Sequence, residues 1–410
     1  MREILFLSHR IPFPPDRGDK IRSHHVLRRL ARIAPVHVAC FADDDTDMAE
    51  EVELASLAMS YRLIRRSKRL ALAGLQALAR RRAVSLSAFH DPLLADYVAH
   101  LLATRPIGTI FVFSGQMGQY VPDDFAGKVI MDLCDVDSAK FEAYAAQSRG
   151  LMRWVHAREA DLLRREEARL AARADVTLLI SAEEAALFSS RLSPAERRAA
   201  DVRVLGNGID SAFFDPALVA PAPQLRDLPA PRLIFTGQMD YSPNVDAVLR
   251  AADKIMPLVR EHLPEATFHI VGRNPTEDVL DRHGTNGTYV WGRVDDVRVW
   301  LKAADIAIAP LDIARGVQNK VMEAMAMELP VVLTRAAATG IDAVDGHHFT
   351  IAESDAALAE AIVALAQAPA EASVLGMAAR RFVVEQQSWQ SALACLPEMI
   401  GRHRLVRDAA

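Results

Sequence analysis

The sequence lacks several features that would place it in whole classes of protein. Its 410 residues include only three cysteines, Cys40, Cys134 and Cys395, which are too far apart to predict a disulfide framework or a zinc site. No apolar run approaches the ~20 residues that a transmembrane helix needs, and the first run, at residues 4–7, is too short for a signal-peptide core. We therefore expect a cytoplasmic protein with reduced thiols.

The chain also has little net charge. The formal charge is −5, the apolar share is 51% and the charged share is 25%, as in ordinary globular proteins. A nucleic acid is therefore not an expected partner. A length of 410 residues exceeds what one hydrophobic core usually covers, so two domains are expected.

Short apolar runs alternate with amphipathic stretches, which is typical of parallel βαβ units. The pattern predicts an α/β fold with two Rossmann-like, doubly wound domains, and ligands at the carboxyl ends of the strands. The predicted N-terminal domain covers residues 1–215, a proline-rich linker covers 216–231, and a second domain covers 232–385. Residues 386–410 are predicted to form a helix that packs back on the first domain. The predicted strands are 3–8, 36–41, 109–113, 128–133, 175–181, 201–205, 232–236, 267–271, 288–290, 306–309 and 331–333.

One segment of the second domain has the pattern of an anion-binding loop and helix. Gly316 precedes Val317, Gln318 and Asn319, and an amphipathic helix with Lys320 and Glu323 follows. A helix N-terminus carries partial positive charge and free N–H donors, which suit a diphosphate, and Lys320 adds a full charge. Glu323 lies three residues further on, where its carboxylate can accept hydrogen bonds from sugar hydroxyls. The alternative is an ordinary Lys/Glu surface pair.

The first predicted strand is followed by a proline-stiffened loop that delivers Gly18 to the start of a helix. His9 and Arg10 lie in this loop and Arg22 in the helix, so an anion or a polar acceptor is a plausible ligand. The loop is not G-x-G-x-x-G, so the dinucleotide fingerprint is absent. A purely structural turn is the alternative.

Asp132, Asp135 and Asp137 form a D-x-x-D-x-D run at a predicted strand end. Three close carboxylates can bind Mg²⁺. The interpretation we favour is a strand-to-helix junction with Asp137 or Ser138 as N-cap, or a site for acceptor hydroxyls.

Several of these motifs together resemble those of a known family. The chain resembles the retaining nucleotide-sugar glycosyltransferases of family 4, which have the two-domain GT-B fold. Within that family it is similar to the sugar transferases associated with exosortase-type exopolysaccharide systems. The stretches that carry the resemblance are 205–210 with Phe214 and Pro216, 271–273, 291–294, 304–306 and 316–332, and, for the narrower group, 8–22 and 132–138.

The resemblance implies roles for individual residues. Glu323 would bind the ribose hydroxyls, and residues 317–320 would contact the diphosphate. The base would lie near Arg293 and Val294, and Gly18 would face the donor phosphates. Further donor-side candidates are Gly237, Arg273 and Gly316, and acceptor-side candidates are His9, Arg10, Arg22 and Asp135. No metal and no cofactor is implied.

Three positions depart from the family pattern. Arg315 stands where the first glutamate of the E-x7-E motif is expected, and the loop from Gly237 to Asn244 lacks the usual phosphate-binding Arg/Lys pair. Asp135 lies close to where a histidine is expected. We hypothesise that Arg315 and Lys320 together replace the lost phosphate cations, since an arginine fork binds phosphate well. Lys320, Arg315 and Glu323 are thus the predicted catalytic residues.

Residues 54–90 contain eight basic side chains and no acidic one. A basic, leucine-rich helix within 62–82 is predicted to lie on an anionic membrane surface, and the alternative is a solvated helix packed on the sheet. The whole predicts a peripheral enzyme at the inner face of the cytoplasmic membrane. It would transfer sugar from a nucleotide sugar to a saccharide or lipid-linked saccharide in exopolysaccharide or cell-surface glycan synthesis. The alternatives are a nonhydrolysing nucleotide-sugar epimerase and a non-catalytic nucleotide-binding relative.

Overall fold

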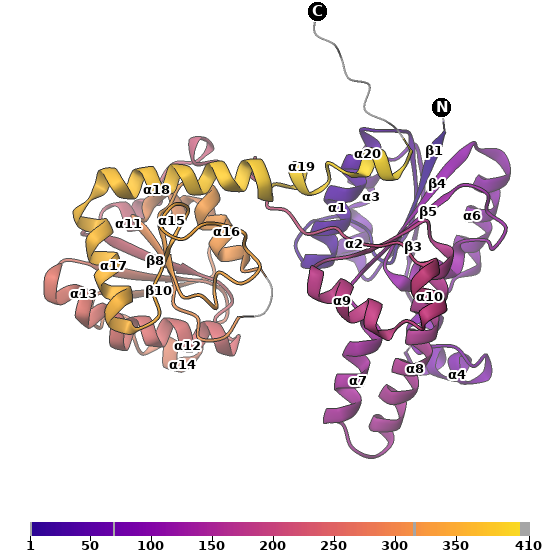
Figure 1. Ribbon diagram of the computed structural model, residues 1–410, viewed down its shortest axis with the longest axis horizontal. Helices are drawn as coiled ribbons and strands as arrows, with labels where there is room; N and C mark the ends of the chain where they lie inside the picture. The colour runs from indigo at the N-terminus through magenta and orange to yellow at the C-terminus, as the bar shows by residue number, and fades with distance from the viewer. Residues whose placement is uncertain (1, 69, 315–316, 402–410) are drawn as a thin grey trace, which may run out of the picture. The chain divides into compact units, whose positions relative to one another are not determined.

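The computed structural model describes residues 2–68, 70–314 and 317–401, and it divides into two compact domains (Figure 1). The first domain comprises residues up to Asn207 together with the segment from Ala392 onward. The second comprises Gly208–Ser391. Within the first domain the C-terminal segment is held to the sheet by the Lys128 ammonium, which donates to the carbonyl of Met399 at 3.2 Å.

The first domain is built on a seven-stranded parallel sheet with strand order β3-β2-β1-β4-β5-β6-β7. Every residue of β1 and β2 is buried, because helices cover both faces of a doubly wound sheet. The strands are β1 (Glu3–Ser8), β2 (Val36–Ala42), β3 (Ser60–Arg65), β4 (Ile107–Phe113), β5 (Lys128–Cys134), β6 (Val176–Leu179) and β7 (Val202–Val204).

The helices of this domain follow the strands in the usual alternation, and α7 and α8 form a hairpin that extends away from the sheet in Figure 1. They are α1 (Gly18–Ala31), α2 (Asp45–Ala49), α3 (Glu51–Leu57), α4 (Leu70–Ala79), α5 (Val84–Ala88), α6 (Pro92–Thr104), η1 (Gly115–Tyr120), α7 (Asp137–Gln147), α8 (Gly150–Arg173), α9 (Ala182–Arg191), α10 (Pro194–Ala199) and α20 (Leu396–Met399).

The second domain has a six-stranded parallel sheet with strand order β10-β9-β8-β11-β12-β13. Its strands are β8 (Arg232–Thr236), β9 (Thr267–Val271), β10 (Thr288–Gly292), β11 (Ile306–Ala309), β12 (Val331–Leu333) and β13 (Thr350–Ile351). Its helices are η2 (Pro216–Leu218), α11 (Pro223–Arg226), α12 (Ser242–Arg250), η3 (Ala251–Ile255), α13 (Met256–His262), α14 (Glu277–Leu280), α15 (Val297–Ala303), α16 (Asn319–Ala326), α17 (Asp355–Gln367), α18 (Pro369–Phe382), η4 (Val383–Gln387) and α19 (Trp389–Ala392).

The strand order reverses direction in the middle of each sheet. The reversal lies between β1 and β4 in the first domain and between β8 and β11 in the second. In open α/β sheets, ligands bind outside the carboxyl ends of the strands at this point. The topology thus predicts a ligand site at the carboxyl ends of these four strands.

The predicted fold class is confirmed, and β1, β8, β9, β11 and β12 have the predicted bounds. Two strands were missed. β3 was missed because it lies in the segment predicted to be a basic helix. Its arginines hide the apolar pattern of a strand, and as an edge strand it has no fully buried residue. β13 has only two residues, too few for any periodicity.

Among the described residues, no single helix is long and apolar enough to cross a membrane. The bent pair of α17 with the segment from Pro369 to Gln387 reaches that length and composition only when taken together.

A buried ion pair joins three parts of the first domain. The Arg22 guanidinium in α1 donates from Nε and Nη2 to both oxygens of Asp132 in β5, at 2.9 and 3.0 Å, and from Nη1 to Asn207 Oδ1 at 3.0 Å. Arg22 is 1% exposed and Asp132 0%. With most of its donors occupied and no exposed surface, Arg22 has a structural role, which replaces the predicted contact with an acceptor.

We expect Arg22→Leu to destabilise the first domain by about 3–5 kcal/mol, because it leaves the Asp132 carboxylate buried without its cation. The free energy of unfolding, measured by urea denaturation, checks this. The matched control is Arg65→Leu, which removes an exposed pair with Asp45 at 2.8 Å and is expected to cost less than ~1 kcal/mol. A loss no larger than that of the control would contradict the structural role.

Candidate functional site

The loops at the carboxyl ends of β8 and β9 approach each other too closely for side chains. A Cβ built on Gly272 would lie 1.6 Å from the carbonyl oxygen of Gly237, so this position admits only glycine. The amide of Gly237 donates to the Val271 carbonyl at 3.1 Å, and that of Gly272 donates to the Gly292 carbonyl at 2.8 Å. The first three strands of this sheet thus end in a compact backbone platform.

Helix α16 begins beside this platform. Val321, Met322 and Met325 are buried against the core, whereas Lys320 and Glu323 are only partly buried on another face of the helix. The helix forms here because this apolar side packs on the sheet. Gln318 is the N-cap residue, and its side chain does not cap the helix.

The Lys320 ammonium is held by two side chains, Asn244 and Phe235. It donates to Asn244 Oδ1 and lies over the Phe235 ring, 4.5 Å from its centre. The amide nitrogen of Asn244 donates in turn to the Gln238 carbonyl at 2.8 Å, which turns the amide oxygen toward Lys320. A Cβ on Gly237 would lie 3.5 Å from Nζ, so the glycine keeps space open beside the ammonium.

Burial changes the protonation of both side chains. Burial lowers the pKa of Lys320 to about 8, although the Glu323 carboxylate opposes the shift. Burial also raises the pKa of Glu323 to about 7, against the effect of Lys320. At neutral pH the ammonium is therefore mostly charged, and the carboxyl group is close to half ionised.

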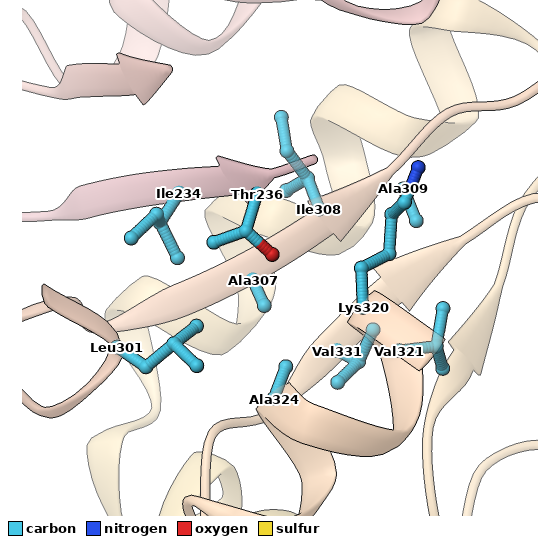
Figure 2. A pocket seen from close by; sticks show the side chains of 10 residues that line it. All are labelled: Ile234, Thr236, Leu301, Ala307, Ile308, Ala309, Lys320, Val321, Ala324 and Val331. Carbon is cyan, nitrogen blue, oxygen red and sulfur yellow. The ribbon is translucent and has the colours of Figure 1, made fainter. Parts of the chain in front are cut away.

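A small cavity lies beneath Lys320, between the sheet and α16 (Figure 2). Its volume is about 10 Å³, which is room for roughly one water molecule. In Figure 2 the Lys320 chain extends from the first turn of α16, with its nitrogen directed away from the apolar side chains of Leu301 and Ala324. A nucleotide needs a far larger space, so this cavity is a packing gap and not a nucleotide site. The lining residues are Ile234, Thr236, Leu301, Ala307, Ile308, Ala309, Lys320, Val321, Ala324 and Val331.

The other predicted donor residues lie around the same strand ends or outside the residues that the structure describes. Arg273 follows β9 and donates to Gln238 Oε1 at 2.8 Å. Arg293 is exposed after β10, and Val294 packs partly on the core. Val317 and Asn319 are exposed before and at the start of α16. Arg315 and Gly316 lie outside the described residues.

In the first domain the predicted residues gather at the end of β1. The His9 ring stacks on Phe113 of β4, with 5.8 Å between ring centres, and its Nε2 lies 3.2 Å from Asp19. Within the part of the chain that the structure describes, its buried Nδ1 has no hydrogen-bond partner. Burial lowers the pKa of His9, with Asp19 opposing the shift, so the ring is neutral.

Arg10 is held between two carboxylates at the same strand end. It donates to Asp19 at 2.7 Å and to Asp43 at 2.6 Å. Gly18 begins α1 as predicted, with nothing within 4 Å of a Cβ built there, so packing does not demand a glycine at this position.

The D-x-x-D-x-D run is not a cluster. Asp132 pairs with Arg22, whereas Asp135 and Asp137 contact Lys140 at 2.8 and 3.3 Å. The predicted N-cap is wrong: Val136 occupies that position, and Ser138 instead donates from its amide and hydroxyl to Glu167 at 2.9 and 2.6 Å. Over the described ranges, no group of three or more His, Cys, Asp or Glu side chains is placed to hold a metal ion.

Two residues at the switch points were missed from the sequence. Asn244 lies in the loop noted only for lacking basic residues, and its role depends on a contact with Lys320, which is 76 positions away. Ser114 follows β4 with φ 79°, a left-handed conformation that is rare outside glycine and common at functional sites. Nothing in the sequence signals that conformation.

Comparison with known proteins agrees with this arrangement. Residues 230–368 match the family model described as Glycosyl transferases group 1, whereas no curated protein matches the sequence. HepE from Anabaena, solved in complex with UDP, superposes with a TM-score of 0.61 at 13% identity and covers 98% of this chain and 99% of its own. Sucrose-phosphate synthase from Thermosynechococcus elongatus gives 0.58 at 16% identity, covering 97% and 98%. WaaG, described as a glycosyltransferase involved in lipopolysaccharide biosynthesis, gives 0.57 at 15% identity, covering 97% and 100%.

The chain has the GT-B fold. Lys320, Asn244 and Phe235 lie in the second domain, within the residues that match this family model. The narrower resemblance to exosortase-associated sugar transferases stays a prediction.

The two shifted pKa values give a testable pH dependence for nucleoside diphosphate binding. In the roles predicted from the sequence, Lys320 contacts the diphosphate as an ammonium and Glu323 accepts hydrogen bonds from the ribose as a carboxylate. We expect the affinity for UDP to rise as pH increases through about 7 and to fall above about 8. Calorimetric titration between about pH 5.5 and about pH 9.5 would measure it.

Two variants test which side chain controls each side of that pH profile. Glu323→Gln is expected to remove the dependence below pH 7. Asn244→Asp is expected to move the alkaline fall to higher pH, because a carboxylate beside Lys320 favours its charged form. An unchanged profile in both variants would show that other groups control binding.

Proposed function

We propose that this protein is a retaining glycosyltransferase that uses a nucleotide diphosphate sugar and needs no metal. The observation that carries the proposal is the partly buried ammonium of Lys320, held by Asn244 and Phe235 at the switch point of the domain that matches Glycosyl transferases group 1. A cation fixed in this way suits the diphosphate of a donor. Glu323 lies one turn away, where it suits the ribose.

In the proposed reaction the bond between the sugar C1 and the diphosphate oxygen breaks, and a bond from C1 to an acceptor hydroxyl oxygen forms on the same face. Lys320, Arg315 and the first amides of α16 stabilise the negative charge that develops on the leaving diphosphate. The acceptor proton passes to an oxygen of the departing phosphate. No side-chain base is required.

The proposed donor is a uridine, guanosine or adenosine diphosphate sugar, and the proposed acceptor is a saccharide or lipid-linked saccharide. HepE was solved in complex with UDP-glucose, which supports a nucleotide sugar as ligand of this fold. A role in exopolysaccharide or cell-surface glycan synthesis rests on the resemblance of residues 8–22 and 132–138 alone.

Release of nucleoside diphosphate from a panel of UDP-, GDP- and ADP-sugars tests this function, with a lipid extract as acceptor and with or without EDTA. We expect acceptor-dependent release from one donor class, unaffected by EDTA, and a product with the anomeric configuration of the donor by NMR. Lys320→Met is expected to lower kcat/KM at least ~100-fold, because it removes the cation that stabilises the leaving group. Arg315→Glu is expected to raise the KM for the donor.

Other outcomes identify the alternatives. Conversion of the nucleotide sugar without any acceptor would make the protein an epimerase. Tight nucleotide binding without acceptor-dependent release would make it a non-catalytic relative. Retention of full donor affinity in Arg315→Glu would contradict the idea that Arg315 replaces a lost phosphate cation.

We further propose that the protein works at the inner face of the cytoplasmic membrane and contacts it through α4. Leu72, Leu75 and Leu78 are 49%, 66% and 51% exposed, whereas Ala73 and Ala77 on the opposite side are fully buried. The helix therefore packs through small residues and presents its leucines outward, as an interfacial helix does.

The basic residues before α4 contribute less to this contact than expected. Arg65 and Arg66 pair with Asp45 and Asp43, at 2.8 and 2.7 Å. Lys68 donates to the carbonyls of Ser87 and His90. Arg69 lies outside the described residues. The membrane contact accordingly rests on the leucines of α4 and on the arginines that follow it.

We expect Leu75→Ser to weaken binding to vesicles of phosphatidylglycerol and phosphatidylcholine about 5- to 10-fold, since burying a leucine contributes roughly 1.5 kcal/mol or less at a partly immersed site. Flotation assays measure this. The matched control is Leu93→Ser, at a leucine of α6 that is 55% exposed. Equal binding by the two variants would exclude α4 as the contact.

A further inference from the structure

A cavity of about 570 Å³ lies in the first domain at the carboxyl end of α4, in the size range of small-molecule sites. Its wall carries four arginines and two acids: Arg81, Arg82, Arg165, Arg169, Asp123 and Glu166. The nucleotide-sugar chemistry proposed above does not use any of them.

The two acids in the wall are already paired. Arg169 donates to both oxygens of Glu166, at 2.9 and 2.7 Å, and Arg173 donates to Asp123 at 3.1 Å. Arg165 pairs with Asp161 at 2.8 Å. The charges of Arg81 and Arg82 are therefore not balanced by the wall, and the cavity is electropositive.

The position of Arg81 in the cavity wall costs local backbone stability. The amide of Arg82 donates to the Ala77 carbonyl and that of Arg81 to the Leu78 carbonyl, which is the Schellman ending of a helix. Arg81 is the residue in the left-handed conformation, with φ 51°. Glycine is the preferred residue in that position, so an arginine there has no local backbone reason.

The segment is rigidly anchored. Arg158 of α8 donates to the carbonyls of Ala77 and Arg82, at 3.1 and 3.2 Å. The buried Glu159 carboxylate accepts from the amides of Val84 and Ser85 at the start of α5. In Figure 1, α4 lies beside α8. The end of α4 and the cavity wall at Arg81 and Arg82 are thus held in place by α8.

The cavity also offers a hydrogen-bond acceptor. Gln119 lines it, and the buried Oε1 of this residue has no donor among the described residues, while its Nε2 donates to the carbonyls of Leu86 and Gln116. A ligand that fits would carry an anionic group for the arginines and a hydroxyl for Gln119.

We propose that this cavity binds the phosphate headgroup of an anionic membrane lipid that carries a free hydroxyl, such as phosphatidylglycerol. Leu72, Leu75 and Leu78 are the exposed leucines of α4, the helix that leads to Arg81 and Arg82, and they would contact the acyl region. A membrane lipid is favoured over a soluble phosphate, because a soluble phosphate would not contact the exposed leucines of α4. The proposal extends the membrane contact of α4 and does not depend on sugar transfer, since it is tested without any nucleotide sugar.

The test compares binding of the full chain to phosphatidylglycerol-containing vesicles and to pure phosphatidylcholine vesicles. In Arg81→Gly with Arg82→Gln, we expect about a 30-fold loss on anionic vesicles, because each basic residue near an anionic surface contributes roughly a factor of five. Binding to neutral vesicles should not change. Glycine suits the backbone of position 81, so misfolding does not explain a loss.

The matched control is Arg197→Gln with Arg198→Gln, which removes the same charge from two exposed positions of α10. Equal anionic binding by the two double variants would overturn the proposal. So would full competition by free glycerophosphate, which would assign the cavity to a soluble ligand. Loss of binding in Trp154→Ala, a 54% exposed residue of α8, but not in the Arg81 and Arg82 variant, would place the contact on the α7–α8 hairpin instead.

Discussion

The ammonium of Lys320 is the group on which the candidate site depends. Burial alone would favour its neutral form, and the amide oxygen of Asn244 and the ring face of Phe235 offset that cost. Gly237 contributes as well, because a Cβ there would lie 2.9 Å from the amide nitrogen of Asn244 and would displace the amide that holds the ammonium. The result is a positive charge that is fixed before a ligand arrives, and such a charge needs little reorganisation to stabilise an anion.

The parallel sheet explains why residues from distant segments meet at this point. Gly237 follows β8 and Lys320 follows β11, the two strands between which the order reverses. Loops at such a point diverge to opposite sides and leave the strand ends uncovered. Only glycine fits where these loops meet at Gly272, and the backbone of Gly237 lies close to the ammonium.

The sequence was sufficient for the fold, because buried strands of a doubly wound sheet are short, continuous apolar runs. β1 and β8 were predicted to the residue for this reason. It also placed Lys320 and Glu323 at the start of one helix, because their spacing is local information, whereas their roles stay predictions. It was insufficient for Asn244 and for Arg22, because each acts through a contact with a residue many positions away.

Local sequence was most misleading where charge was concerned. Residues 62–68 were interpreted as a free basic surface, yet β3 and the turn after it pair most of those charges with neighbouring carboxylates or carbonyls. A count of basic residues gives the charge of a segment but not the charge that remains for a partner.

The two carboxylates around Arg10 have a consequence for the chemistry of the first domain. Asp19 and Asp43 also pair with Arg17, and Asp43 pairs with Arg66, so three guanidinium groups and two carboxylates meet beside the neutral His9. These groups satisfy one another before any ligand arrives, so an anion gains less there than the number of arginines suggests. An uncharged hydroxyl, which can both give and receive a hydrogen bond, needs no free charge to be held by the same side chains.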